Sequence, residues 1–173
     1  MAEERQPKWE GKASAEIASL KAEQVWSCLE DFCNLHKWLP VLDTCSQVEG
    51  VPGQPGLIRY CTSTQISSSS DGKDDDDQKS STTTTKWANE KLLMIDPIQR
   101  CLSYEVIDSN VGFNGYVATV NVLPIDGGGC TIEWSYVADS VDGWRPEDLA
   151  SYIDYCLQYM AKKMEEEFFL QTS

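Results

Sequence analysis

The segment RPEDLASYIDYCLQYMAKKMEEEFF, residues 145–169, decides the fold. Its apolar residues recur at steps of three and four and therefore fall on one stripe of a helix: Leu149, Ile153, Cys156, Met160, Met164 and Phe168. Pro146 suits the first turn of such a helix, and the acidic Glu147 and Asp148 suit the positive end of its dipole. At 1.5 Å per residue the helix would be roughly 35 Å long, and its apolar stripe needs a surface to cover.

That surface is predicted from seven short segments upstream, which read as strands separated by Gly, Pro, Asn and Asp turn signals. They are residues 8–17, 45–50, 57–66, 86–96, 100–108, 115–125 and 130–139. Together they predict one α+β domain spanning residues 1–173. Its expected architecture is a curved antiparallel sheet of about seven strands around the long C-terminal helix.

Between the first two strands, residues 19–39 have apolar residues at helical spacing. We expect two short helices here, with a break near Asp31. Ser19 is the expected N-cap of the first helix, and Pro40 is the expected end of the second.

Residues 67–86, SSSSDGKDDDDQKSSTTTTK, contain no apolar side chain and could not bury surface on folding. This segment is therefore predicted to be a disordered, acidic hairpin loop. Its four consecutive Asp residues lack the alternating ligand spacing of a calcium loop, so we expect a solvated spacer and no metal site.

Composition excludes several partner classes. The net charge of −14 argues against nucleic acid and against anionic lipid surfaces, because both require clustered Lys and Arg. No run approaches the roughly 18 apolar residues of a membrane span, and residues 1–12 lack the apolar core of a signal peptide. Seven cysteines without a pairing or metal-ligand pattern read as reduced thiols. We therefore expect a cytoplasmic protein without membrane insertion, metal or cofactor.

A charged residue stands out in the segment KWANEKLLMID, residues 86–96. Side chains alternate between the two faces of a strand, so Glu90 shares a face with Ala88, Leu92 and Met94. An unpaired carboxylate among apolar groups is costly, and it usually has a partner or a chemical role. A β-bulge could instead turn Glu90 to solvent.

Two other strands also place one polar group among apolar neighbours. Arg59 shares a face with Leu57 and Cys61, and Tyr116 shares one with Ala118. We expect Arg59 and Glu90 to pair inside the protein, so that neither charge is buried alone. These three residues form a satisfied polar network that shapes the cavity, or they hold the head group of a bound ligand, or they are catalytic. In the catalytic case Arg59 orients a polar oxygen, Glu90 moves a proton and Tyr116 supports either by hydrogen bonding.

A single helix cannot fill the concave face of a curved sheet, so a cavity for a small hydrophobic or amphipathic metabolite is expected between them. Its expected ligand-binding wall comes from the inward faces of the strands and from the helix stripe. The residues are Leu57, Leu92, Ala118, Trp134, Tyr136, Ile153, Cys156 and Met160.

Several short sequence segments resemble those of one known family. They are KWEGK (8–12), EQVWSCLEDFCNLHKWLP (23–40), GLIRY (56–60), WANEKL (87–92), GYVAT (115–119) and EWSY (133–136). These segments resemble the plant lachrymatory-factor-synthase-like branch of the START-like superfamily, which has the helix-grip fold and includes polyketide cyclase, lipid-transport and birch-pollen-allergen-type proteins.

The resemblance implies a cofactor-free isomerase that converts a small sulfenic acid into a thial S-oxide. The cavity Arg, Glu and Tyr of that family match Arg59, Glu90 and Tyr116 here. Two functions from different classes therefore follow from the sequence: a carrier of a small amphipathic metabolite, and an isomerase of this type.

Overall fold

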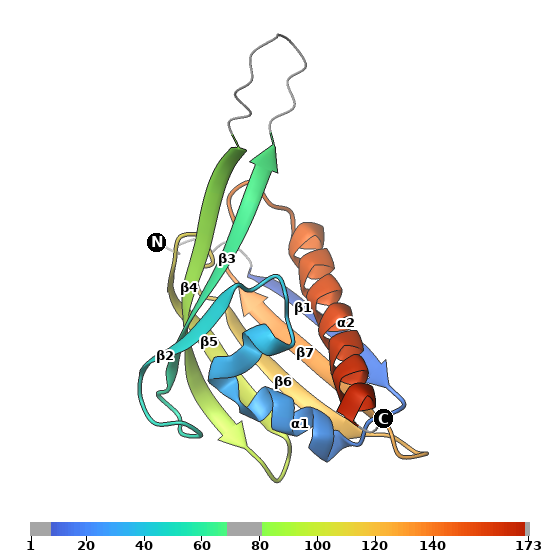
Figure 1. Cartoon of the computed structure of the whole chain (residues 1–173). Coiled ribbons are helices and arrows are strands. Elements are labelled where there is room, and N and C mark those ends of the chain that lie inside the picture. Colours follow the sequence, from blue (N-terminus) through green and yellow to red (C-terminus); the bar gives the residue numbers. More distant parts are fainter. Residues whose placement is uncertain (1–7, 69–80, 172–173) are drawn as a thin grey trace.

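The computed structural model describes residues 8–68 and 81–171, which form a seven-stranded antiparallel sheet curved around one long helix (Figure 1). The chain order is β1 (Trp9–Ile17), α1 (Ala22–Glu30), the 3₁₀ helix η1 (Phe32–Lys37), β2 (Thr44–Glu49), β3 (Ile58–Ser68), β4 (Ser81–Asp96), β5 (Cys101–Ser109), β6 (Val117–Pro124), β7 (Cys130–Ala138) and α2 (Pro146–Gln171). In space the strands run β1-β7-β6-β5-β4-β3-β2. The predicted fold class is confirmed.

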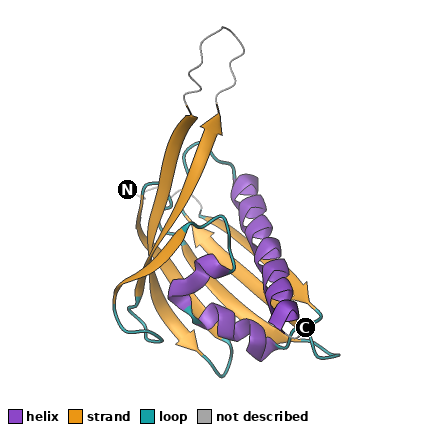
Figure 2. Cartoon of the chain, in the orientation of Figure 1, coloured by secondary structure: helices purple, strands orange, loops and turns teal. Residues whose placement is uncertain are grey.

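All helices lie on one side of the sheet (Figure 2). Strand β7 and most of β5 and β6 alternate buried and half-buried residues, as expected when one face is packed and the other meets water. Along β7 the inward residues are Ile132, Trp134 and Tyr136, and these join Leu157 and Met160 of α2 in one hydrophobic core. Each fully buried large side chain contributes about 1.5 to 3 kcal/mol of stability.

The two short helices differ from the sequence prediction in detail. Helix α1 begins at Ala22 and is capped at Lys21, not at Ser19, because the Gln24 side chain accepts a hydrogen bond from the Lys21 backbone N–H at 2.9 Å. The predicted break is confirmed at Asp31. The second piece is a 3₁₀ helix that ends at Lys37, before Pro40.

Strand β4 contains a bulge that overturns one part of the sequence prediction. Its pairing with β5 shifts register between Leu92 and Met94. As a result Leu92 is fully buried, whereas Met94 is exposed, and Ile95 packs against the core in its place. The expected common face of Glu90, Leu92 and Met94 is therefore wrong at Met94, because one extra residue inverts the alternation.

The β3–β4 hairpin is longer than predicted and extends beyond the neighbouring strands (Figure 1). Ser68 pairs with Ser81, so the ends of the predicted 67–86 loop are strand. The Thr residues at 82–85 are β-branched and favour extended backbone, which outweighs their polarity. The rest of the predicted loop, residues 69–80, lies outside the described residues.

Candidate functional site

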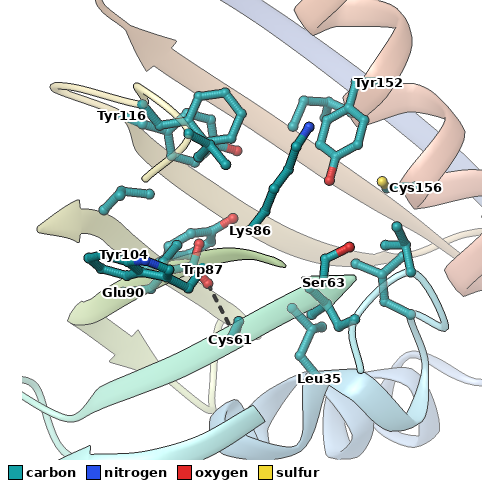
Figure 3. A pocket seen from close by; sticks show the side chains of 18 of the residues that line it. Leu35, Cys61, Ser63, Lys86, Trp87, Glu90, Tyr104, Tyr116, Tyr152 and Cys156 are labelled. Atoms are coloured by element: carbon teal, nitrogen blue, oxygen red, sulfur yellow. Dashed lines mark hydrogen bonds between the residues drawn. The ribbon is translucent and has the colours of Figure 1, made fainter. Parts of the chain in front are cut away.

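A cavity of about 480 Å³ lies between the concave face of the sheet and α2 (Figure 3). Strands β3–β5 and β7 form one wall, α2 forms another, and η1 with the loop after it closes the β2 end. Most of the lining is aromatic or aliphatic. A volume of a few hundred Å³ with an apolar wall is typical of small-molecule sites.

The aromatic part of the wall is one continuous cluster. The Tyr104 ring centroid lies 6.0 Å from the centroid of Tyr116 and 6.0 Å from that of Trp134. Phe113 lies 5.9 Å from Tyr116 and 5.9 Å from Trp144. Offset and edge-on pairs of this kind hold one another in place. The aromatic side chains of the wall are therefore packed against one another as a single group.

Glu90 is the acidic group of the sheet that reaches the cavity surface. Its Oε1 accepts a hydrogen bond from Arg59 Nε at 2.8 Å, across directly paired positions of β3 and β4. The Glu90 side chain is 14% exposed, and that of Arg59 is 3% exposed. Glu90 lines the cavity, whereas Arg59 lies behind it. A ligand would therefore meet the carboxylate first.

Helix η1 satisfies the rest of the buried Arg59 guanidinium. Arg59 Nη1 donates to the Phe32 carbonyl at 2.9 Å, and the guanidinium carbon lies 3.8 Å from the centroid of the Phe32 ring. The Tyr104 ring lies 4.8 Å away on the same group. Hydrogen bonds to an anion and a carbonyl, together with two aromatic faces, offset the cost of burying this charge.

The phenols of the wall stay protonated. Burial raises the pKa of Tyr116 above its ordinary value, and burial, followed by the neighbouring Tyr116, does the same to the pKa of Tyr104. Desolvation of the charged form is the cause, since neither phenolate would be solvated in this wall. At neutral pH both hydroxyl groups keep their proton. The Tyr104 hydroxyl is in hydrogen-bond contact with that of Tyr116, which leaves the Tyr116 proton for a bound molecule.

The structure brings together six of the residues singled out from the sequence. The cavity wall includes Glu90, Tyr116, Trp134, Ile153, Cys156 and Met160. Leu57, Leu92, Ala118 and Tyr136 are buried but lie outside the wall. Tyr136 stacks on Tyr116 with an interplanar angle of 13° and lies over Gly11, where a Cβ atom would approach its hydroxyl within 2.2 Å.

Sequence reasoning missed other members of the wall. Lys86 has the same parity as Ala88 and Glu90 along β4, so strand alternation could have identified it. Tyr152 lies on α2 one residue from the predicted stripe, and Figure 3 shows it beside Cys156. Its position on the flank of the stripe gave no signal.

The described residues also limit the kinds of site present. Within them, no group of three or more His, Cys, Asp or Glu side chains is arranged to hold a metal ion. In the same part of the chain, no helix combines the length and the apolar composition that crossing a bilayer requires.

Several solved structures share this fold. The protein XoxI from Bacillus cereus has a TM-score of 0.68 at 19% identity, covering 95% of this chain and 98% of that one. A protein from Thermobifida fusca has a TM-score of 0.67 at 22% identity, covering 91% and 93%. Major latex-like protein 151 of ginseng, Panax ginseng, has a TM-score of 0.69 at 17% identity, covering 94% and 98%.

At these identities the likeness shows the fold alone. Membership comes from the sequence itself, because a family model matches residues 8–165, from the first strand into the last third of α2. The chain belongs to the polyketide cyclase / dehydrase and lipid transport family.

Proposed function

We propose that this protein binds and carries a small amphipathic metabolite in the cavity under α2. The observation that carries the proposal is the cavity itself: about 480 Å³, lined by aromatic and aliphatic side chains with few polar groups. Burying an apolar body against such a wall supplies affinity, while the polar groups fix orientation.

Lys86 is the cation of this wall. Its side chain extends into the cavity toward Tyr152 (Figure 3). The ion pairs between described residues do not include it, whereas the other charged group of the wall, Glu90, is paired with Arg59. A ligand carboxylate or sulfonate could therefore form a charge-assisted hydrogen bond with Lys86.

A second polar group of the wall also lacks a protein partner. Trp134 Nε1 is buried near the Tyr116 hydroxyl but forms no well-aligned hydrogen bond with a described residue. A buried donor left unpaired costs about 1 to 3 kcal/mol. An acceptor on the ligand would relieve that cost, so we assign one polar oxygen of the ligand to the Trp134 side of the cavity.

The test is a titration with anilinonaphthalene sulfonate, a fluorescent anion with an apolar body. We expect saturable binding to one site. Ile153→Trp, which places an indole in the cavity, should weaken binding at least about tenfold, or 1.4 kcal/mol. Ile98→Trp is the matched control, because Ile98 is 84% exposed and lies outside the wall. Equal binding by both variants would refute this site.

Native mass spectrometry of the purified protein provides a second test of the same proposal. A co-purifying small molecule, released by denaturation, would identify the ligand class. We expect it to carry an acidic group and an apolar body, and to be absent from Ile153→Trp.

A second candidate function is the cofactor-free isomerase of the lachrymatory-factor-synthase type. It is supported by the proximity of a carboxylate and protonated phenols in one cavity wall: Glu90, Tyr104 and Tyr116 all line it. In this arrangement Glu90 moves the proton and Tyr116 donates a hydrogen bond to the substrate oxygen. Arg59 lies behind Glu90 and acts as a positioning residue.

This function is tested by turnover of propenesulfenic acid generated in situ by an alliinase. Thial S-oxide formed above the background without protein, and lost in Glu90→Gln, would make the protein an enzyme. Binding of anilinonaphthalene sulfonate by the same variant shows whether the cavity has survived. Turnover that persists in Glu90→Gln would exclude the proton-transfer role.

A further inference from the structure

Two thiols face each other at the β2–β3 end of the cavity. Cys45 and Cys61 occupy directly paired positions of these antiparallel strands, and their Sγ atoms lie 3.3 Å apart in a hydrogen-bonded contact. Both side chains are buried, at 9% and 4% exposure. Nothing in the proposed carrier function uses this pair.

The backbone of the pair already suits a disulfide. Directly opposed residues of antiparallel strands have Cα atoms about 4.5 or about 5.5 Å apart, depending on their place in the ladder. Both values fall within the range of about 4.4 to 6.8 Å that disulfides span. Small rotations of the two side chains would bring the sulfurs into bonding distance without moving the strands.

The pair is also acidic for buried thiols. A hydrogen bond from the Cys61 thiol, with a further contribution from the nearby Arg59 guanidinium, lowers the pKa of Cys45 to about 7, whereas the same hydrogen bond and burial raise the pKa of Cys61. Removing one proton from the pair leaves one hydrogen-bonded thiolate, and the remaining proton is shared between the two sulfurs. Thiolates, not thiols, attack oxidants.

In the other five cysteines the thiol pKa is raised, not lowered. Burial raises the pKa of Cys28 to about 11, and burial also raises the pKa of Cys33, Cys101, Cys130 and Cys156. All seven cysteines are free thiols. The facing pair is thus chemically distinct within the protein.

Access comes through the cavity. Cys61 lines it, and Cys45 lies behind Cys61 against η1, with its thiol 4.0 Å from the Phe32 carbonyl. A small, uncharged oxidant that enters the cavity meets the Cys61 sulfur. Transfer of the shared proton to Cys45 makes Cys61 the attacking thiolate and leaves Cys45 as the second thiol.

We propose that Cys45 and Cys61 form a redox-active dithiol, which a small hydroperoxide entering the cavity oxidises to a disulfide. The thiolate attacks one peroxide oxygen, the O–O bond breaks, and the leaving oxygen takes up a proton to become water or an alcohol. The attacking sulfur becomes a sulfenic acid. The second thiol then attacks that sulfur, the S–S bond forms, and the hydroxyl group leaves with a proton as water. Two thiols lose two electrons in total, and the peroxide gains them.

Oxidation would alter the candidate site directly. When Cys45 supplies the proton of the sulfur–sulfur contact, the Cys61 thiol donates to Glu90 Oε1 at 3.9 Å, the dashed contact in Figure 3. A disulfide has no S–H donor, so this contact ends and Glu90 keeps Arg59 as its donor among these neighbours. The dithiol therefore couples the redox state of the cavity wall to the carboxylate that a ligand meets.

The test treats the full-length, reduced protein with hydrogen peroxide, blocks the remaining thiols with iodoacetamide and measures the intact mass. We expect two fewer alkylated cysteines and a Cys45–Cys61 cross-linked peptide after digestion. The reaction should be on the order of tenfold faster than oxidation of any other cysteine, because each unit of pKa changes the thiolate fraction about tenfold.

Variants separate the steps. Cys45→Ser and Cys61→Ser should each stop the disulfide, and Cys45→Ser should accumulate a sulfenic acid at Cys61 that dimedone traps. Cys130→Ser, at a buried thiol outside the cavity wall, is the matched control and should still form the disulfide. The wild-type peptide map alone decides the proposal if a variant fails to fold.

Two results would overturn it: seven alkylatable thiols after peroxide treatment, or a disulfide that joins other cysteines. Because this readout does not depend on ligand binding, it remains valid if the carrier function is disproved.

Discussion

The concave face has two halves that are built differently. Under η1, strands β2–β4 hold a buried ion pair and two facing thiols, Cys45 and Cys61. Under α2, strands β5–β7 present aromatic rings against aliphatic side chains such as Leu157 and Met160. The same sheet therefore changes from an ionic to an apolar interior over a few strands.

The covering helices account for the difference. Inside an α-helix such as α2, the carbonyl groups are occupied by intrahelical hydrogen bonds, so the helix offers its side chains alone. A short 3₁₀ helix leaves more of its backbone groups free. A carbonyl oxygen has two lone pairs, and that of Phe32, at the start of η1, accepts from Arg59. A buried charge is tolerated where irregular backbone can solvate it.

The strongest test of the difference between the two halves is to remove Arg59, the cation of the ionic half. Arg59→Leu leaves the Glu90 carboxylate and the Phe32 carbonyl without their donor. We expect a loss of about 3 to 5 kcal/mol in the free energy of unfolding, because a buried charge loses its partner. Urea denaturation measures it. Lys163→Ala, which breaks the exposed pair with Glu167, is the control and should cost about 0.5 kcal/mol or less.

In the apolar half, the stability cost of a substitution should depend on the side-chain volume that is removed and not on charge. Met160→Ala removes a fully buried side chain that lines the cavity and should cost about 2 to 3 kcal/mol, at the low end for such substitutions because the site borders an existing void. Urea denaturation measures this loss as well. A cost as large as that of Arg59→Leu would contradict the distinction between the two halves.

High pH should lower the free energy of unfolding through the buried phenols of the apolar half. The pKa of Tyr116 is raised in the folded protein, whereas the unfolded chain has the ordinary value of about 10. Below that pH both states hold the proton and stability is unaffected. Above it the unfolded state loses the proton first, so the free energy of unfolding falls by about 1.4 kcal/mol per pH unit for each such phenol.

Urea denaturation between about pH 8 and about pH 11 measures this slope. Tyr116→Phe removes one titrating group, and we expect a shallower decline. An unchanged slope in this variant would mean that Tyr116 does not titrate as its burial requires.

The smallest expected effect concerns Lys86, the cation proposed to contact the ligand. Lys86→Met should weaken binding of anilinonaphthalene sulfonate about tenfold, roughly 1.4 kcal/mol, because one charge-assisted hydrogen bond is lost. Lys86→Arg should restore most of it. Lys91→Met, on the same strand but outside the wall, should leave the affinity unchanged. A neutral probe should bind both Lys86 variants equally well.

Strand alternation and helix periodicity predicted the features that depend on local pattern. The long α2, the number of strands and the cross-strand contact of Arg59 with Glu90 follow from periods of 3.6 and 2 residues. The bulge that turns Met94 outward does not, because it depends on how β4 pairs with β5. The sequence also predicted which side chains are buried better than which of them line the cavity. Leu57, Leu92 and Ala118 are buried as expected but do not line it, because packing alone decides whether a buried side chain borders the cavity.

The sheet order leaves β1 and β2 as its two open edges. Unpaired strand edges invite pairing with strands of other molecules and so promote aggregation. Strand β2 is only six residues long and shifts register between Gln47 and Glu49, which interrupts a regular template. Strand β1 exposes Glu10 and Lys12 along its length. Both edges thus discourage intermolecular sheet growth, and the sheet can stay open around its cavity without closing into a barrel.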